Sequence, residues 1–137
     1  MVAPWFGVAK VGLELYAAAG PEAVRALQDA GLAVFVDLKL HDIPTTVGRA
    51  ARVLGGLGAR YLNFHASGGT AMLRAGVEGL AEGAAAVTAV DRSEHSLALA
   101  EGAAHLNNVS VSCVRAEAFA EMARLEAAGD RFGLVVV

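Results

Sequence analysis

Val34-Phe35-Val36-Asp37-Leu38-Lys39-Leu40-His41-Asp42 is an apolar run, typical of a buried strand, with charged side chains toward its end. Burying a charge is costly unless it is paired, so Asp37, Lys39 and Asp42 need an explanation. On a strand Asp37 and Lys39 point to the same face, because side chains two residues apart do so. Pro44 then marks a turn and the start of a helix. Charges where a strand ends in a loop are typical of active sites in α/β folds.

The composition fits one domain over residues 1–137, with a core of small aliphatic side chains. Apolar residues make up 55% of the chain and aromatic residues only 6%, with 16 glycines. Such a core is typical of a parallel sheet covered by alanine-rich helices.

Apolar, β-rich runs recur about every 25 residues and alternate with helical patterns. The runs begin near Gly7, Ala33, Ala59, Ala86, Val109 and Phe132. The first is expected to extend over residues 7–15, and helices are expected over 21–30, 44–57, 70–82, 93–106 and 117–128. This βα repeat predicts an α/β fold, an open, mostly parallel sheet of five or six strands with helices on both faces. The architecture would be a Rossmann-like or flavodoxin-like three-layer fold, not a closed barrel.

Charge and cysteine usage exclude several classes of partner. The net charge is −3 and no basic block exists, so no nucleic-acid partner is expected. The single Cys113 allows no internal disulfide and suits a reducing cytoplasm. The first residues lack the basic region and cleavage site of a signal peptide. No apolar run reaches the ~18 residues that a membrane span requires, so no membrane partner is expected and the predicted location is cytoplasmic.

Lys10, Asp37, Lys39 and Asp42 are the candidate catalytic residues, because they could form an alternating charge array at neighbouring strand ends. Opposite charges close together keep one another ionised. A lysine between carboxylates can protonate a developing carbanion. The alternative is a structural network of ion pairs at the same strand ends.

Other polar residues give weaker signals. His41 and His65 lie near strand ends, but no cluster has the spacing of metal ligands, so no metal is expected. The loop Ser67-Gly68-Gly69-Thr70 could bind a phosphate through backbone N–H groups, or use its glycines only for a tight turn. Asp91, at the end of a later strand, could bind ribose hydroxyls or cap the next helix.

Residues from about 3 to 83 resemble orotidine 5′-phosphate decarboxylase. The similarity is carried by Lys10-Val11-Gly12-Leu13-Glu14, Asp37-Leu38-Lys39-Leu40-His41-Asp42-Ile43-Pro44 and Phe64-His65-Ala66-Ser67-Gly68-Gly69. It implies that Lys10, Asp37, Lys39 and Asp42 form the catalytic array, that Lys39 protonates the carbon left by carbon dioxide, and that Asp42 acts across a dimer interface. Thr45 stands where the family usually has Asn. The similarity covers the second to fourth strands of an eight-stranded barrel, without the first strand and the phosphate-binding loops.

Residues from about 84 onward resemble a Rossmann-like S-adenosylmethionine-dependent methyltransferase of the kind that modifies ribosomal RNA. The similarity is carried by Val90-Asp91-Arg92-Ser93, Val114-Arg115-Ala116-Glu117-Ala118-Phe119 and Phe132-Gly133-Leu134. It implies that Asp91 binds the cofactor ribose, that Glu117 contacts the adenine, and that Gly68 and Gly69 occupy the glycine-rich loop. The crossover between the two parts would lie at residues 83–86.

These observations lead to the hypothesis of a non-natural chimera of two incomplete enzymes, without native catalytic function and without a cofactor. Both ends, at a strand, would then be cut ends. One alternative is residual decarboxylation of orotidine 5′-phosphate, and another is a module that binds a nucleotide or S-adenosylmethionine. An exposed sheet edge favours self-association as a dimer or swapped oligomer. The runs near Ala33 and Phe132 would compete for one edge of the run near Ala59.

Overall fold

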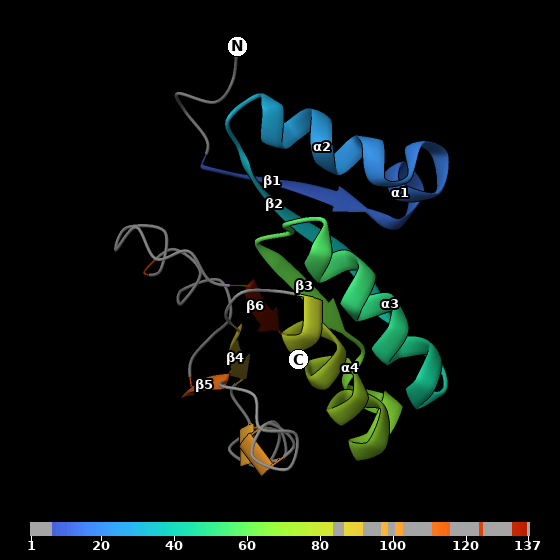
Figure 1. Ribbon diagram of the computed structural model, residues 1–137, viewed down its shortest axis with the longest axis vertical. Coiled ribbons are helices and arrows are strands. Elements are labelled where there is room, and N and C mark those ends of the chain that lie inside the picture. Colours follow the sequence, from blue (N-terminus) through green and yellow to red (C-terminus); the bar gives the residue numbers. More distant parts are fainter. Residues whose placement is uncertain are drawn as a thin grey trace.

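The computed structural model describes residues 7–83, 87–91, 97–98, 101–102, 111–115, 124 and 133–136. Strands and helices alternate along the chain, as the repeat predicts (Figure 1). The elements are β1 (Val8–Gly12), α1 (Leu13–Ala19), α2 (Pro21–Asp29), β2 (Ala33–Leu40), α3 (Pro44–Gly56), β3 (Tyr61–Phe64), a 3₁₀ turn (Ala66–Gly68), α4 (Gly69–Gly83), β4 (Val87–Asp91), β5 (Val111–Arg115) and β6 (Gly133–Val136).

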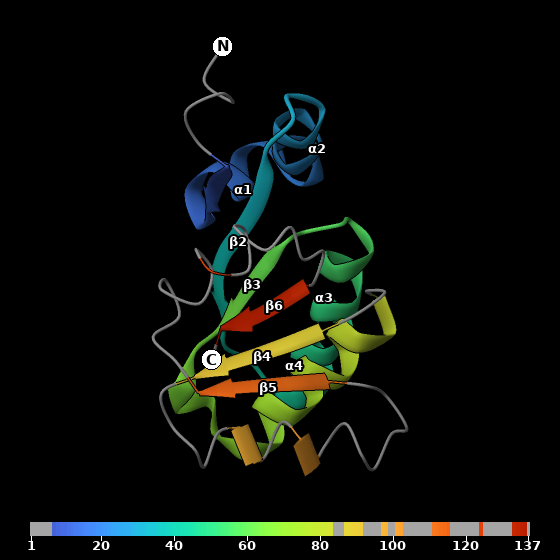
Figure 2. The same cartoon turned by 90° about the vertical axis from the view of Figure 1, so that its left-hand side faces the viewer.

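The six strands form one parallel sheet in the order β1-β2-β3-β6-β4-β5. Figure 2 shows β6 between β3 and β4, with β5 beyond β4. Among the described strands, β1 and β5 have one neighbour each, so the sheet is open. The prediction of an open α/β sheet, not a closed barrel, is confirmed.

The expected competition for one edge of β3 was wrong. β3 pairs with β2 along one edge and with β6 along the other, and β4 pairs with the far side of β6. A strand inside a sheet has two edges, so both neighbours are accommodated. The two pairings leave β3 as a central strand.

The described helices α2, α3 and α4 lie on the same side of the sheet (Figure 1). Right-handed crossovers produce this arrangement, because β1, β2, β3 and β4 follow one another in a single direction across the sheet. None of the described helices is long and apolar enough to cross a membrane. The helices expected after Asp91 and after Arg115 lie largely outside the described residues.

The first strand is shorter than expected, because β1 ends at Gly12 and α1 begins at Leu13. The sequence Leu-Glu-Leu-Tyr-Ala-Ala-Ala consists mostly of good helix formers, which favours a helix once the strand stops pairing. No residue of α1 is buried, and the side chains of Leu13 and Leu15 are exposed. An apolar surface therefore lies next to the carboxyl end of β1.

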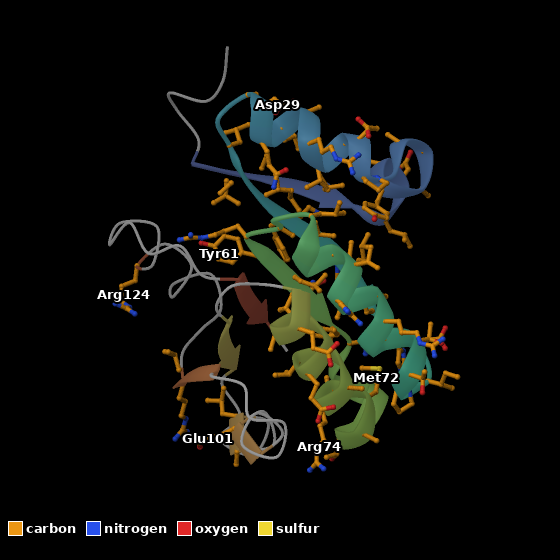
Figure 3. All side chains as sticks on the ribbon, in the orientation of Figure 1. Asp29, Tyr61, Met72, Arg74, Glu101 and Arg124 are labelled. Carbon is orange, nitrogen blue, oxygen red and sulfur yellow. The ribbon has the colours of Figure 1, made fainter. Side chains whose placement is uncertain are left out.

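One core joins the sheet to the helices. Tyr61 on β3 and Met72 on α4, both labelled in Figure 3, are each 1% exposed. The other large side chains with less than 2% exposure are Val11, Val24, Val34, Val36, Val47, Leu62, Val77 and Leu80. This aliphatic core agrees with the composition and fixes the strand ends that carry the candidate site.

Candidate active site

Three charged side chains meet at the carboxyl ends of β1 and β2, and we call them the lysine–aspartate cluster: Lys10, Asp37 and Lys39. Lys10 Nζ lies 2.9 Å from Asp37 Oδ2, and Lys39 Nζ lies 2.5 Å from Asp37 Oδ1. Asp37 is 10% exposed, whereas the side chains of Lys10 and Lys39 are 58% and 60% exposed. The carboxylate is thus held inside the site, with two ammonium groups open to solvent on either side.

Gly12 lies beside the contact between Lys10 and Asp37 in the strand register. The parallel register sets Gly12 opposite Asp37 and Lys10 opposite Phe35. Lys10 must therefore reach two residues along the strand, over a position that has no side chain. A Cβ atom on Gly12 would lie 3.7 Å from Lys10 Nζ.

Lys39 lies in a distortion of β2. Val36 pairs with Leu62 and Leu40 pairs with Phe64, so β2 advances four residues where β3 advances two. Lys39 has a φ of 49°, a left-handed conformation that costs a side-chain-bearing residue about 1–2 kcal/mol. Strained backbone of this kind is concentrated at functional sites, where the surrounding structure maintains it.

Asn63 on β3 completes the site, a role that was not predicted from the sequence. Its Nδ2 donates a hydrogen bond to Asp37 Oδ1 at 2.7 Å, and its Oδ1 accepts one from the Lys39 backbone N–H at 2.8 Å. The available signal was a polar residue inside the apolar strand Tyr-Leu-Asn-Phe. Its partners on β2 could not be identified without the register between β2 and β3.

Burial raises the pKa of Asp37, but its hydrogen bonds outweigh this effect. Lys39, Lys10 and Asn63 all donate to the carboxylate, and the charge of Lys39 adds a further attraction. Together they hold the pKa of Asp37 well below its ordinary value of 3.8. Asp37 is therefore ionised at every pH at which the protein would work.

This depressed pKa predicts a loss of stability in acid. A carboxylate with a lower pKa in the folded than in the unfolded state stabilises the fold above the unfolded value of 3.8. That contribution, on the order of 1–2 kcal/mol, is lost as the pH falls below about 4. Urea unfolding of Asp37→Asn and of the unsubstituted protein should therefore give free energies that differ more at pH 7 than at pH 3. An equal difference at both pH values would contradict the assignment.

Asp42 does not join the lysine–aspartate cluster within the chain. It is exposed, and its Oδ1 accepts a hydrogen bond from the backbone N–H of Ile43 at 2.6 Å. No ion pair among the described residues links it to Lys10 or Lys39. Its proposed action across a dimer interface stays a prediction.

His41 and His65 follow the carboxyl ends of β2 and β3, and their rings stack with centroids 4.8 Å apart. Nδ1 of His65 lies 2.7 Å from Ser67 Oγ and accepts a hydrogen bond from the Ser67 backbone N–H. These contacts order the turn before α4. Across the described part of the chain, no group of three or more His, Cys, Asp or Glu side chains is placed to hold a metal ion.

The four predicted cofactor-binding residues fall at separate places. Gly68 ends the 3₁₀ turn and its N–H donates to the carbonyl of His65, while Gly69 begins α4 with a φ of 79°. Asp91 ends β4, with β6 between β4 and β3. Glu117 lies outside the described residues. The structure therefore does not place the glycine loop and Asp91 on adjacent strands.

Parallel strands covered by helices, with a lysine–aspartate cluster at their carboxyl ends, define an α/β protein with its candidate site where such folds bind ligands. Comparison with known families gives the more specific assignment. The chain belongs to the orotidine 5′-phosphate decarboxylase / HUMPS family, whose profile matches residues 2–136.

Individual relatives agree with this family. The orotidine 5′-phosphate decarboxylase of Nitratidesulfovibrio vulgaris (strain Miyazaki F) is 46% identical over 127 residues, 91% of this chain and 49% of that protein. The enzyme of the same name from Streptococcus thermophilus is 58% identical over 74 residues, 54% of this chain and 32% of that protein. An uncharacterized conserved protein from Geobacillus kaustophilus superposes with a TM-score of 0.59 and 28% identity, over 98% of this chain and 82% of that one. The chain thus spans half or less of the length of these two curated relatives.

These comparisons correct the interpretation of the chain as a chimera without native function. The family profile extends to residue 136, and the Nitratidesulfovibrio relative aligns over 91% of the chain. No comparison supports a methyltransferase fragment after residue 83. The hypothesis was wrong because short strand-end patterns such as Val-Asp and Phe-Gly-Leu occur in many α/β folds and do not distinguish one family from another.

Proposed function

We propose that this chain carries the chemistry of a lyase that converts orotidine 5′-phosphate to uridine 5′-phosphate, a step of pyrimidine biosynthesis. The lysine–aspartate cluster is the observation that carries the proposal. It places two exposed ammonium groups on one largely buried carboxylate, at the carboxyl ends of the strands, where α/β enzymes bind substrates. The names of the relatives support the choice of substrate.

The proposed reaction requires one proton and no cofactor. The bond between the ring carbon and the substrate carboxylate breaks, carbon dioxide leaves, and the electron pair stays on the ring carbon. Lys39 donates a proton to that carbon, becomes a neutral amine, and regains a proton from water. Asp37 holds the ammonium group in place before the transfer, through the 2.5 Å contact. A positioned acid of this kind contributes about 10²- to 10⁴-fold to a rate.

Lys10 has a different role in this proposal. Its ammonium group contacts the other oxygen of Asp37, so it cannot occupy the position of Lys39. It offsets the charge of Asp37 while leaving the proton of Lys39 available. Two cations on one carboxylate also leave a net positive charge in the cluster, which suits an anionic substrate.

The direct test is release of labelled carbon dioxide from orotidine 5′-phosphate that carries ¹³C in its carboxylate. The purified chain should release label faster than the same buffer without protein. Release at the buffer rate at millimolar substrate would contradict the proposal. A circular dichroism spectrum of the same sample establishes that the protein assayed is folded.

We also propose that the chain acts as a dimer through the surface around the carboxyl ends of β1 and β2. Ile43 and Leu13 each follow one of these neighbouring strands and are 65% and 66% exposed. Exposed apolar side chains of this size at the ends of neighbouring strands support an interaction site there. Asp42 precedes Ile43 directly, so this contact would bring Asp42 toward the partner's site.

Sedimentation velocity tests the dimer. The unsubstituted chain should sediment as a dimer at micromolar concentration, and Ile43→Asp should shift it to the monomer, because a charge would be buried in the contact. Val53→Asp is the matched control: Val53 is 62% exposed near the other end of α3 and should leave the dimer intact. A monomer without any substitution, or equal effects of the two variants, would contradict the proposed surface.

A further inference from the structure

We propose that Asn63 is the positioning residue of the lysine–aspartate cluster, because its amide holds the distorted end of β2 in the conformation that brings Lys39 to Asp37. The kinetic part of this inference rests on the proposed decarboxylation. The structural part does not, since it concerns the geometry of the cluster alone.

The distortion of β2 leaves the backbone of Lys39 without its regular partner. β2 carries two more residues than β3 between the pairs Val36–Leu62 and Leu40–Phe64, so the ladder is interrupted at Lys39. The Lys39 N–H donates instead to Asn63 Oδ1 at 2.8 Å. A side-chain amide thus takes the place of a strand hydrogen bond at the residue with the left-handed backbone.

The other end of the same amide fixes the carboxylate. Asn63 Nδ2 donates to Asp37 Oδ1 at 2.7 Å, and this oxygen also accepts the hydrogen bond from Lys39 Nζ. The backbone of Lys39, the amide of Asn63 and the carboxylate of Asp37 therefore form a closed ring with the Lys39 side chain. Rotation of the Lys39 backbone would break one contact of the ring, which explains how a strained φ is maintained.

An amide is the group that can fill both positions. It offers an acceptor and a donor on one planar group. Leucine has a similar size and offers neither, whereas aspartate keeps the acceptor for the Lys39 N–H but would direct a second carboxylate at Asp37. Replacements by these two residues separate the two contacts.

The experiment compares Asn63→Leu and Asn63→Asp with Gln28→Leu as a matched control. Gln28 is also a side-chain amide with two hydrogen bonds, to the carbonyls of Leu57 and Gly58, but it is remote from the cluster. Three quantities are measured on each full-length variant: hydrogen exchange of the Lys39 amide, the pKa of Asp37 by ¹³C NMR, and kcat and KM for orotidine 5′-phosphate.

Asn63→Leu should speed exchange at Lys39 by about 10-fold or more and raise the pKa of Asp37, because both contacts are lost. Its kcat should fall about 100-fold with KM changed less than about 3-fold, as for a misplaced catalytic group. Asn63→Asp should keep the Lys39 amide protected and raise the pKa of Asp37. Gln28→Leu should change none of the three quantities.

Exchange and pKa values in Asn63→Leu equal to those of Gln28→Leu would overturn the inference. If Asn63→Leu does not fold, Asn63→Asp decides it, and an unchanged pKa of Asp37 there overturns it. If the unsubstituted chain does not turn over orotidine 5′-phosphate, the proposed function fails, whereas the two NMR measurements still decide the role of Asn63.

Discussion

Replacing Lys39 with alanine is expected to lower kcat for orotidine 5′-phosphate by about 1,000-fold or more. The variant loses the proton donor, and water at the same place is a weaker and less well-positioned acid. The fold should persist, because the side chain is 60% exposed and Asp37 keeps its contacts with Lys10 and Asn63. The measurement is steady-state decarboxylation, with the free energy of unfolding determined by urea on the same preparation.

Arg25→Ala is the matched control for this prediction. Arg25 is an exposed cation that pairs with Glu22 on α2, so its removal also breaks one surface ion pair. It should leave kcat within about 2-fold of the unsubstituted value. Equal losses in the two variants, or a Lys39→Ala variant with full activity, would show that Lys39 is not the proton donor.

Replacing Gly79 with alanine is expected to destabilise the fold by about 3 kcal/mol, at the upper end of the range for overpacking. A Cβ atom there would lie 2.0 Å from the carbonyl oxygen and 2.9 Å from the Cα of Gly48. These are backbone atoms of α3, so no side chain can move aside and the two helices must separate. Since β2 ends at Leu40 and α3 begins at Pro44, the change would also disturb the strand end that carries the cluster. Urea unfolding followed by circular dichroism measures the effect.

Gly56→Ala provides the comparison for Gly79→Ala. Gly56 is the last residue of α3, and no atom lies within 4 Å of the position its Cβ would take. Alanine restricts the unfolded chain and favours the helix, so this variant should gain about 0.5–1 kcal/mol. A Gly79→Ala variant as stable as Gly56→Ala would contradict the close contact between α3 and α4.

The elements were predictable because they depend on short-range sequence. Pro21 and Pro44 mark helix starts that the structure confirms, and α2 ends within a residue of the expected position. The exception was α1, where Gly12 ends the strand and an apolar helix follows without being buried. The length of that strand depends on its pairing with β2, which local sequence does not encode.

The candidate site was predictable only in part. Asp37 and Lys39 share a face because of strand periodicity alone, and their charges required partners. Asn63 could not be found in this way, since its role depends on the register between β2 and β3 and on a distortion of that register. Asp42 was predicted to belong to the same catalytic array as Asp37 and Lys39. In the structure it is exposed and does not contact the lysine–aspartate cluster within the chain.

The sequence by itself therefore determined the alternating strands and helices, the parallel sheet and the charges that need one another. Only the tertiary structure decided that β6 lies between β3 and β4, and that a single amide joins Lys39 to Asp37. The physical reason is the sequence separation of the interacting residues. Propensity and periodicity act within one helix or strand. Strand order and the Asn63 contacts form between residues distant in the chain, where many pairings satisfy the same local pattern.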